Sequence, residues 1–365
     1  MGVEVRRAMS VSVWLVLALC LAACSRDAVT LSMRADGLPE SDCSAQLFAE
    51  GWDRSLAATF DGLAVTASVH DTATDCTYAL HDDVRLTTAS AIKLQILAAN
   101  LARVEDLDRP LGAQEREHAE RMLWYSHNSP PTSQLYVAVG TSGMERFSEA
   151  VGASSVHHTP IYGITETNAL ELNLATRATL DLHATTSPLT IESRQFARDL
   201  LADVHFTQRW GVSAGLPADH EVWLKNGFFP CTRCGPFGGV YTWRVSSTGF
   251  VERPDGTGWA ITILTDGSTT QRQGMRAVEA ISRHVAGLLA EGDPVDRPVE
   301  TANCTTVESG ESALSATVRL GLSAEDWPDV KWVSGNESPL SGQLICAPEP
   351  LTGLSACVCP DRTSQ

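Results

Sequence analysis

Short stretches in which hydrophobic and polar residues alternate lie near both ends of the central part of the chain, and hydrophobic residues recur at helical spacing between them. The alternation predicts strands at Leu63–His70, Thr77–Leu80, Glu221–Leu224, Val240–Ser246 and Trp259–Leu264. The helical spacing predicts helices at Ser44–Thr59, throughout 89–201, and at Gln271–Leu289. We therefore expect an α+β fold, in which both ends build one antiparallel sheet flanked by helices, with a separate helical lobe and a cleft beside it.

The first residues follow neither pattern, because two arginines precede an apolar run at 11–23 that is too short to span a bilayer comfortably. The run ends in Leu-Ala-Ala-Cys at 21–24, which resembles the bacterial lipobox, whose cysteine is acylated after cleavage. We expect residues 1–23 to be a lipoprotein signal peptide and Cys24 to carry the lipid. Residues 24–40 would then tether the protein to the outer face of the bacterial cell membrane. The alternative is an ordinary signal peptide with an incidental cysteine.

Export changes the interpretation of the cysteines, because thiols outside the cytosol tend to oxidise. Of the ten cysteines, Cys20 and Cys24 fall in the leader, and the other eight form an even set that predicts disulfides of open connectivity. These are Cys43, Cys76, Cys231, Cys234, Cys304, Cys346, Cys357 and Cys359. A zinc site at Cys231-x-x-Cys234 is the competing hypothesis, but no second ligand pair follows it. We expect one large domain at 41–292 and a disulfide-stapled C-terminal extension at 299–365.

A net charge of −17, from 44 acidic and 27 basic residues, argues against nucleic acid as a partner and against adhesion to anionic lipid headgroups. The adjacent His157 and His158 have no nearby cysteines or paired carboxylates, which favours a solvated loop over a metal site. We expect a monomer that uses no metal or cofactor and meets the membrane through its N-terminal lipid.

The candidate chemistry begins at Ser90 and Lys93, where a polar pair opens an unusually apolar predicted helix at 91–101. A spacing of three puts both side chains on one helix face, and the serine lies near the positive end of the helix dipole. A lysine buried in such a helix is unfavourable unless it is paired or neutral, and a neutral lysine can accept a proton from a serine. Ser-x-x-Lys alone is a weak pattern, since most occurrences are solvated helix ends.

Two further segments strengthen this hypothesis. Ser126-His127-Asn128 follows a predicted helix at 114–125. Lys225-Asn226-Gly227 ends a predicted strand, where glycine lets another backbone approach closely. In this order the three segments resemble the penicillin-recognising serine hydrolases, whose class A β-lactamases carry Ser-x-x-Lys, Ser-Asp-Asn and Lys-Thr-Gly. The resemblance covers about residues 40 to 290, and several segments look like actinobacterial β-lactamase-related hydrolases.

The resemblance implies an acyl-transfer mechanism. Ser90 would be the acylated nucleophile and Lys93 its proton acceptor or relay. Ser126 would pass a proton to the leaving nitrogen of the substrate. The backbone N–H groups of Ser90 and Phe228 would form the oxyanion hole, which stabilises the developing negative charge on the carbonyl oxygen.

The resemblance also implies a substrate-binding set with two departures from the family. Asn128 would bind the amide side chain of the substrate, and Lys225 and Gly227 would lie along its carboxylate end. His127 stands where the family has aspartate, and Asn226 stands where it has threonine or serine. The second change removes a hydroxyl that helps to bind the carboxylate, although the amide of Asn226 can still donate a hydrogen bond.

The deacylating glutamate is the largest gap in the resemblance. Class A enzymes place Glu-x-x-x-Asn between the second and third motifs, and this glutamate activates the water that releases the acyl group. Counting back four residues from Asn173 gives Ala169, so Glu166 and Glu171 remain as candidates at a shifted spacing. Without such a base, acylation would proceed while hydrolysis stayed slow, as in a penicillin-binding protein.

Three functional hypotheses follow. The first is an exported class A β-lactamase-like hydrolase that forms an acyl-enzyme on Ser90 and hydrolyses a β-lactam or a related amide. The second is a D-alanyl-D-alanine peptidase or penicillin-binding protein that acts on cell-wall peptides and deacylates slowly. The third is a surface-anchored scaffold that has lost turnover and binds a partner through its tail. The retained serines, lysines and asparagine favour chemistry, and the shifted glutamate favours slow chemistry over efficient antibiotic resistance.

Overall fold

The computed structural model describes Cys43, Leu47, Phe48, residues 62–232, 239–290 and 292, and the backbone of three short strands further on. The predicted signal peptide, the tether, the helix expected at 44–59 and most of the C-terminal extension lie outside the described residues. The described residues belong to one unit that starts at Cys43. Among them, no helix is both long enough and apolar enough to cross a membrane.

Strands and helices follow one another in the expected order. The strands of the main domain are β1 (Ala64–Asp71), β2 (Cys76–Leu80), β3 (Leu86–Thr87), β4 (Glu166–Thr167), β5 (Glu221–Cys231), β6 (Thr242–Glu252) and β7 (Gly258–Ser268). The α-helices are α3 (Ile92–Asp106), α4 (Ala113–Trp124), α5 (Ser133–Ala150), α6 (Ala169–Leu180), α7 (Ile191–Ala202) and α8 (Gln271–Leu289). Short helical turns are η1 (Ala89–Ala91), η2 (Asn128–Thr132), η3 (Tyr162–Ile164) and η4 (Phe206–Gln208). The extension contributes β8 (Cys304–Thr306), β9 (Lys331–Trp332) and β10 (Leu344–Cys346), which pair in the order β8–β10–β9.

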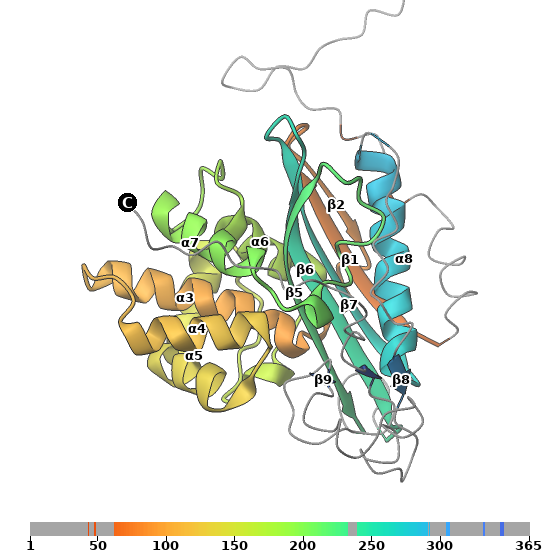
Figure 1. Cartoon of the computed structure of the whole chain (residues 1–365), viewed down its shortest axis with the longest axis horizontal. Helices are drawn as coiled ribbons and strands as arrows, with labels where there is room; N and C mark the ends of the chain where they lie inside the picture. Colours follow the sequence, from red (N-terminus) through yellow and green to blue (C-terminus); the bar gives the residue numbers. More distant parts are fainter. Residues whose placement is uncertain are drawn as a thin grey trace, which may run out of the picture. The chain divides into compact units, whose positions relative to one another are not determined.

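The main sheet has five antiparallel strands in the order β2–β1–β7–β6–β5 (Figure 1). Its first two strands come from the start of the domain and the other three from its end, and β1 pairs with β7 along its whole length. The prediction that both ends build one antiparallel sheet is therefore confirmed. β5 forms one edge of this sheet and β2 the other.

β5 and β6 extend further than the alternation of hydrophobic and polar residues indicated. β5 continues beyond Leu224 to Cys231, and β6 continues beyond Ser246 to Glu252. Alternation marks a strand that has one face in water, whereas β6 is buried on both faces along nearly all its length. Sequence patterning also missed the second half of β5, which carries the third motif.

Helix α8 covers one face of the sheet, as Figure 1 shows. It buries an apolar stripe at helical spacing, made of Met275, Val278, Ile281 and Val285. This stripe packs against side chains of the sheet that include Trp243, Val245, Ile261 and Ile263. The predicted final helix has the observed bounds, because its amphipathic pattern is unusually regular.

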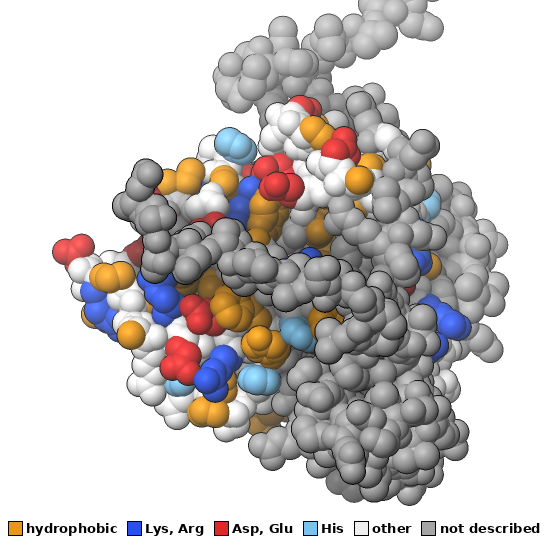
Figure 2. Space-filling view, in the orientation of Figure 1, with side chains coloured by type: hydrophobic (Ala, Val, Ile, Leu, Met, Phe, Trp, Pro, Cys, Tyr) orange, Lys and Arg blue, Asp and Glu red, His pale blue; other side chains and the backbone are white. Residues whose placement is uncertain are grey.

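Helices α3 to α7 form the lobe on the other side of the sheet (Figure 1). α3 lies at the centre of the lobe and is buried along almost its entire length, including the side chain of Lys93. On the face seen in Figure 2, the described acidic and basic side chains of the lobe are interspersed. Ion pairs within the lobe include Arg103 with Glu115 and Arg121 with Glu117.

His158 does not lie in a solvated loop, which corrects the sequence-based expectation for this residue. Its side chain is 7% exposed, whereas His157 is exposed. The His158 Nε2 atom lies 2.8 Å from Oγ of Ser148, which also accepts a hydrogen bond from Gln95 at 2.7 Å. Burial lowers the pKa of His158 from 6.5 to about 4. This imidazole is therefore neutral in the folded domain at neutral pH.

The buried His158 is expected to make the domain acid-sensitive. Because folding lowers its pKa, the unfolded chain binds the proton first as the pH falls below 6.5. The stabilisation is complete above pH 6.5 and is lost progressively down to about pH 4, by about 3 kcal/mol in total. Urea unfolding at pH 7 and pH 4.5 measures this loss. The pH dependence should be weaker by this amount in His158→Gln, and an identical pH dependence in both proteins would contradict the assignment.

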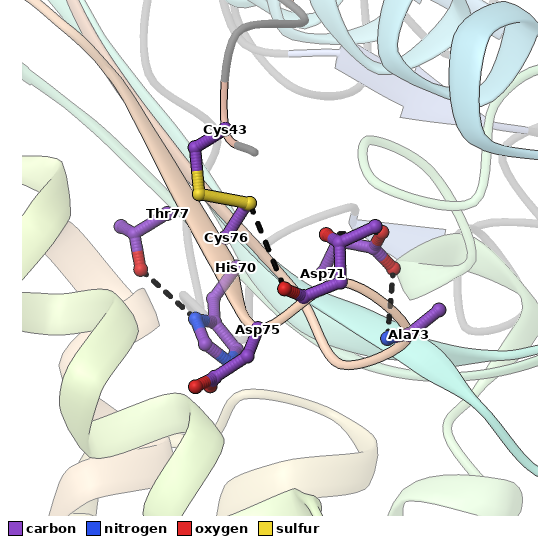
Figure 3. Close-up of a disulfide and its surroundings, with 8 residues drawn as sticks. Cys43, His70, Asp71, Ala73, Asp75, Cys76 and Thr77 are labelled. Carbon is purple, nitrogen blue, oxygen red and sulfur yellow. Dashed lines mark hydrogen bonds and ion pairs between the residues drawn. A yellow bond between two sulfur atoms is a disulfide. The ribbon is translucent and has the colours of Figure 1, made fainter. Parts of the chain in front are cut away.

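A disulfide joins Cys43 to Cys76 at the start of β2, with the two Cα atoms 5.5 Å apart (Figure 3). It closes a loop with a sequence separation of 33 residues, which in the chain-entropy model is worth about 4 kcal/mol. His70 lies next to it, where Nδ1 is 2.9 Å from Oγ1 of Thr77 and Nε2 is 3.6 Å from a carboxylate oxygen of Asp75. Cys231 is also disulfide-bonded, which favours a disulfide over the zinc hypothesis at that position.

Candidate active site

Three segments that are far apart in the sequence meet where the lobe faces the edge strand β5. Ser90 lies in η1 at the start of α3, Ser126 follows α4, and Lys225 lies on β5. Ser90 and Ser126 line the same cavity, and Nζ of Lys225 donates a hydrogen bond to Oγ of Ser126 at 3.0 Å. The structure thus brings together the three motifs that the sequence analysis singled out.

The nucleophile candidate Ser90 sits in a fixed backbone environment. η1 runs directly into α3, and Ile92 and Leu94 of the first turn are almost completely buried. Ala89, immediately before the serine, has a φ of +49°, and Ser126 has a φ of +60°. Residues with a side chain rarely adopt this left-handed conformation, which persists where the surrounding structure imposes it. Tight packing of α3 therefore sets the position of Ser90 at the cavity wall.

Lys93 lies one helical turn after Ser90 and is completely buried. Its Nζ atom lies 3.1 Å from Oγ and 2.6 Å from the carbonyl oxygen of Ser126, and 2.8 Å from Oδ1 of Asn128. Burial holds the pKa of Lys93 well below its usual value, and the charge of nearby Lys225 lowers it further. Both effects favour the neutral amine, which is the form of Lys93 that can accept a proton.

Lys225 approaches Ser126 from the side of the sheet. Besides its hydrogen bond to Ser126, its Nζ atom donates to the carbonyl oxygen of Asn226 at 2.7 Å. Burial lowers the pKa of Lys225 to about 7. The hydroxyl of Ser126 is thus placed between two amines, an arrangement that allows a proton to pass from one side of the cavity to the other.

Gly227 brings the edge strand against the start of α3. A Cβ atom at this position would lie 2.4 Å from the backbone nitrogen of Ser90 and 2.5 Å from that of Ala91. No side chain fits in that space, so the third motif requires glycine. Phe228 follows on β5 and lines the cavity together with Ser90. The backbone N–H groups expected to form the oxyanion hole therefore belong to two segments in close contact, although the hole itself stays a prediction.

Asn226 is not placed in the cavity, which corrects the expected substrate contact. Its amide donates to the carbonyl oxygens of Gln208 at 2.7 Å and Trp210 at 3.0 Å, and its Oδ1 accepts from Ser247 at 2.6 Å. Successive residues of a strand point to opposite faces, so Asn226 faces away when Lys225 and Gly227 face the site. Its amide ties β5 to the segment that follows η4.

Asn128 shares the cavity with a residue that the sequence analysis missed. Besides the contact with Lys93, its Oδ1 accepts a hydrogen bond from the hydroxyl of Tyr162 at 3.1 Å. Burial raises the pKa of Tyr162 to about 12, so this hydroxyl keeps its proton. Two partners on one oxygen fix the orientation of the Asn128 amide. A tyrosine in a loop without a recognisable motif gave no signal in the sequence.

The cavity has a volume of about 310 Å³, which is the size of a small-molecule site. The described residues that line it are Ala89, Ser90, Ser126, Asn128, Ile161, Tyr162, Gly163, Ile164, Phe228 and Phe229. No aspartate or glutamate is among them. Within the described part of the chain, no group of histidine, cysteine and carboxylate side chains could hold a metal ion either.

Neither candidate for the deacylating glutamate lines the cavity. Glu171 accepts hydrogen bonds from the backbone and hydroxyl of Ser155, and from Oγ1 of Thr167 at 3.3 Å. Glu166 lies on β4, paired with Thr87 of β3. Asn173, from which the spacing was counted, lies within α6 and donates to two groups of the sheet. The spacing argument is therefore corrected, because Asn173 belongs to a buried helix face and marks no catalytic loop.

Two arginines near the third motif, Arg233 and Arg244, could offer a second contact to a substrate carboxylate, but Arg244 does not line the cavity. Arg233 lies outside the described residues. Arg244 is fully buried and forms an ion pair with Asp266 at 3.1 Å. Its guanidinium also donates to the carbonyl oxygens of Cys231 at 2.6 Å and Thr242 at 2.9 Å. Arg244 therefore ties the end of β5 to the start of β6.

Sequence comparison does not assign this chain to a family, since no family model and no curated protein match it. The structure, in contrast, has the fold of the penicillin-recognising serine hydrolases. One similar solved structure is the ancestral class A β-lactamase, at 20% identity and a TM-score of 0.54, over 67% of this chain and 100% of that chain. A β-lactamase from Chitinophaga pinensis is similar at 18% identity and a TM-score of 0.54, over 64% of this chain and 97% of that chain.

A mutant of PBP-A, solved as an acyl-enzyme complex with penicillin G, is similar at 18% identity and a TM-score of 0.51. The match covers 64% of this chain and 93% of that chain. The neighbours thus include both β-lactamases and a protein whose name is PBP-A, and at these identities they show a shared fold. The expectation of a β-lactamase-like α+β fold is confirmed.

Proposed function

We propose that this chain is an exported serine hydrolase of the β-lactamase-like type, which forms an acyl-enzyme on Ser90 with a β-lactam or a cell-wall peptide and releases it slowly. The observation that carries the proposal is the placement of Ser126 between Lys93 and Lys225 in the wall of the cavity that Ser90 lines. Two buried lysines around one hydroxyl destabilise a fold, because each ammonium group either loses its hydration or gives up its proton. Such an arrangement is typical of a catalytic site.

The geometry supports a stepwise acyl transfer. Lys93, whose pKa burial lowers, takes the proton of the Ser90 hydroxyl while the Ser90 oxygen attacks the carbonyl carbon of the substrate amide. The N–H groups of Ser90 and Phe228 hold the resulting oxyanion. The carbon–nitrogen bond then breaks, and the leaving nitrogen receives the proton from Lys93 through the hydroxyl of Ser126. Lys225 attracts the carboxylate of the substrate, and the product of this half-reaction is an ester on Ser90.

Slow hydrolysis of the ester on Ser90 is proposed because the described cavity lining contains no carboxylate. Hydrolysis of the ester needs a base that deprotonates water, and no aspartate or glutamate is among the described residues that line the cavity. This observation favours the second candidate function, a penicillin-binding peptidase, over an efficient resistance enzyme. The mutant of PBP-A that was captured as an acyl-enzyme with penicillin G has the same fold. A scaffold without chemistry would have no reason to keep the two buried lysines.

The proposed location rests on the sequence. Cys24 would carry the lipid, and residues 24–40 would hold a monomeric catalytic domain at the outer face of the cell membrane, where cell-wall peptides are accessible. The observed Cys43–Cys76 disulfide supports an oxidising compartment.

The experiment that tests the proposal is a time course of intact mass for the full chain in detergent micelles after addition of benzylpenicillin. We expect an adduct with the mass of the whole antibiotic, which persists for many minutes and maps to the peptide that contains Ser90. Rapid formation of ring-opened product with little adduct would favour an efficient β-lactamase. Absence of both adduct and product would favour the scaffold hypothesis.

A further inference from the structure

The lining of the cavity combines two kinds of side chain. Ser90, Ser126 and Asn128 contribute polar groups, and Ile161, Ile164 and Phe229 contribute large apolar side chains, which we call the walls. We infer that the side chain on the acyl part of the substrate is an uncharged apolar group, held between Phe229 on the sheet side and Ile161 and Ile164 on the lobe side. This inference rests on the proposed acyl transfer and names the class of substrate that the same site selects.

Phe229 belongs to the catalytic face of β5. Side chains on a strand alternate between two faces, and Lys225 and Gly227 contact Ser126 and Ser90. Phe229, two residues after Gly227, therefore points to the same face of β5. Phe228 lies on the opposite face, where its ring packs near those of Trp210 and Trp243, at centroid distances of 6.1 Å and 6.3 Å.

The opposite wall comes from the segment around η3. The ring of Tyr162 packs against the ring of Tyr136 at a centroid distance of 5.5 Å, and its hydroxyl is bonded to Asn128. This anchoring holds Ile161 and Ile164 on either side of the tyrosine at the cavity. Ile161 is 64% exposed, so a large apolar side chain remains open to solvent beside the nucleophile candidate. An apolar acyl group would remove that surface from water.

The described lining residues offer no charged partner for a charged side chain on the acyl group. Among the described lining residues, none carries a charge, since Tyr162 keeps its proton. The two nearby amines, Lys93 and Lys225, are buried behind Ser126 and are bonded to it. A carboxylate or ammonium on the side chain of the acyl group would lose water between Phe229 and Ile161 without gaining a counter-charge from the described lining residues. The walls therefore select for apolar acyl groups and against charged ones.

A matched series of penicillins tests the inference. Benzylpenicillin, ampicillin and carbenicillin carry hydrogen, an ammonium and a carboxylate, respectively, at the same carbon of one side chain. The second-order rate of adduct formation is measured by intact mass with the full chain in micelles. Each rate is divided by the rate of hydroxide-catalysed ring opening of the same compound, which removes differences in intrinsic reactivity. We expect the normalised rate for benzylpenicillin to exceed those for ampicillin and carbenicillin at least tenfold.

A variant with a charged residue in the wall tests whether the wall causes this preference. Ile161→Lys should raise the rate for carbenicillin relative to benzylpenicillin by about tenfold, because the new ammonium meets the carboxylate. Leu107→Lys makes the same change at an exposed residue just beyond the far end of α3, about 22 Å along the helix from the site, and should leave the ratio unchanged.

The outcomes separate this inference from the proposed function. Adducts that form with all three penicillins at similar normalised rates would overturn the inference and leave the acyl-transfer proposal intact. A preference for benzylpenicillin that Ile161→Lys does not alter would also overturn it, because the wall would then not be its cause. If none of the three compounds forms an adduct, the proposed function and the inference both fail.

Discussion

Ser90→Ala is expected to abolish the penicillin adduct, because alanine offers no oxygen to which the acyl group could bind. Slow β-lactam hydrolysis, where it is measurable, should fall by at least about 10⁴-fold, to the background that binding and the oxyanion hole sustain. Intact mass spectrometry measures the adduct, and absorbance of a chromogenic cephalosporin measures hydrolysis. Ser90 lines the cavity at the start of a tightly packed helix, so loss of its hydroxyl should leave the fold unchanged.

The matched control for this variant is Ser142→Ala, which removes a hydroxyl from an exposed position on α5. It should form the adduct at the wild-type rate. Thermal melts of both variants show whether the fold is retained. An adduct of unchanged yield in Ser90→Ala would mean that another nucleophile reacts, and the acyl-transfer assignment would have to be abandoned.

Lys93→Met is expected to lower the rate of acylation at pH 7 by about 10³-fold, the typical contribution of a positioned general base. Methionine has a similar length and suits a buried site, but it cannot accept a proton. Stopped-flow mixing with a chromogenic β-lactam followed by mass analysis gives the rate. In the wild-type protein the rate should fall as the pH is lowered through the depressed pKa of Lys93, because the protonated amine is no longer a base.

Lys93→Arg distinguishes a base from a positive charge at this position. Arginine keeps its charge at any accessible pH and therefore cannot accept the proton of Ser90. If neutral Lys93 is the base, the arginine variant should be as slow as the methionine variant. A variant with arginine that retains most of the wild-type rate, with an unchanged pH profile, would contradict the role of Lys93 as a base. Circular dichroism of each variant checks that the buried substitution still folds.

The order of strands and helices could be predicted because each element carries its own hydrophobic period. The hairpin of β1 and β2, the helices of the lobe and the bounds of α8 all follow from local patterns. The short motifs around Ser90, Ser126 and Lys225 could be found because the residue types and their order are distinctive. What brings them together is the pairing of β5 at the sheet edge, which no local pattern shows.

The side-chain assignments that failed depend on tertiary structure. Asn226 seemed a substrate ligand because it stands next to Lys225, but alternation on a strand puts neighbours on opposite faces. The search for the deacylating glutamate failed because the Glu-x-x-x-Asn spacing applies to a catalytic loop, whereas Asn173 lies within α6. His158 is buried because Ser148 of α5 and Gln95 of α3 meet it from separate helices. The apolar walls were not predicted because Ile161 lies in a loop and Phe229 on a strand, and neither residue belongs to a motif.

The disulfide between Cys43 and Cys76 fixes the entry of the chain into its domain at β2, the edge strand opposite β5. Four interstrand spacings separate these edges, which is about 19 Å. Anything attached before Cys43, whether a natural anchor, a fusion partner or an immobilising surface, therefore pulls covalently on the non-catalytic edge. Mechanical load on the attachment passes into β2 and spares the strand that holds Lys225 and Gly227. Attachment through the N-terminus should consequently suit sensor formats that need an accessible and undistorted cavity.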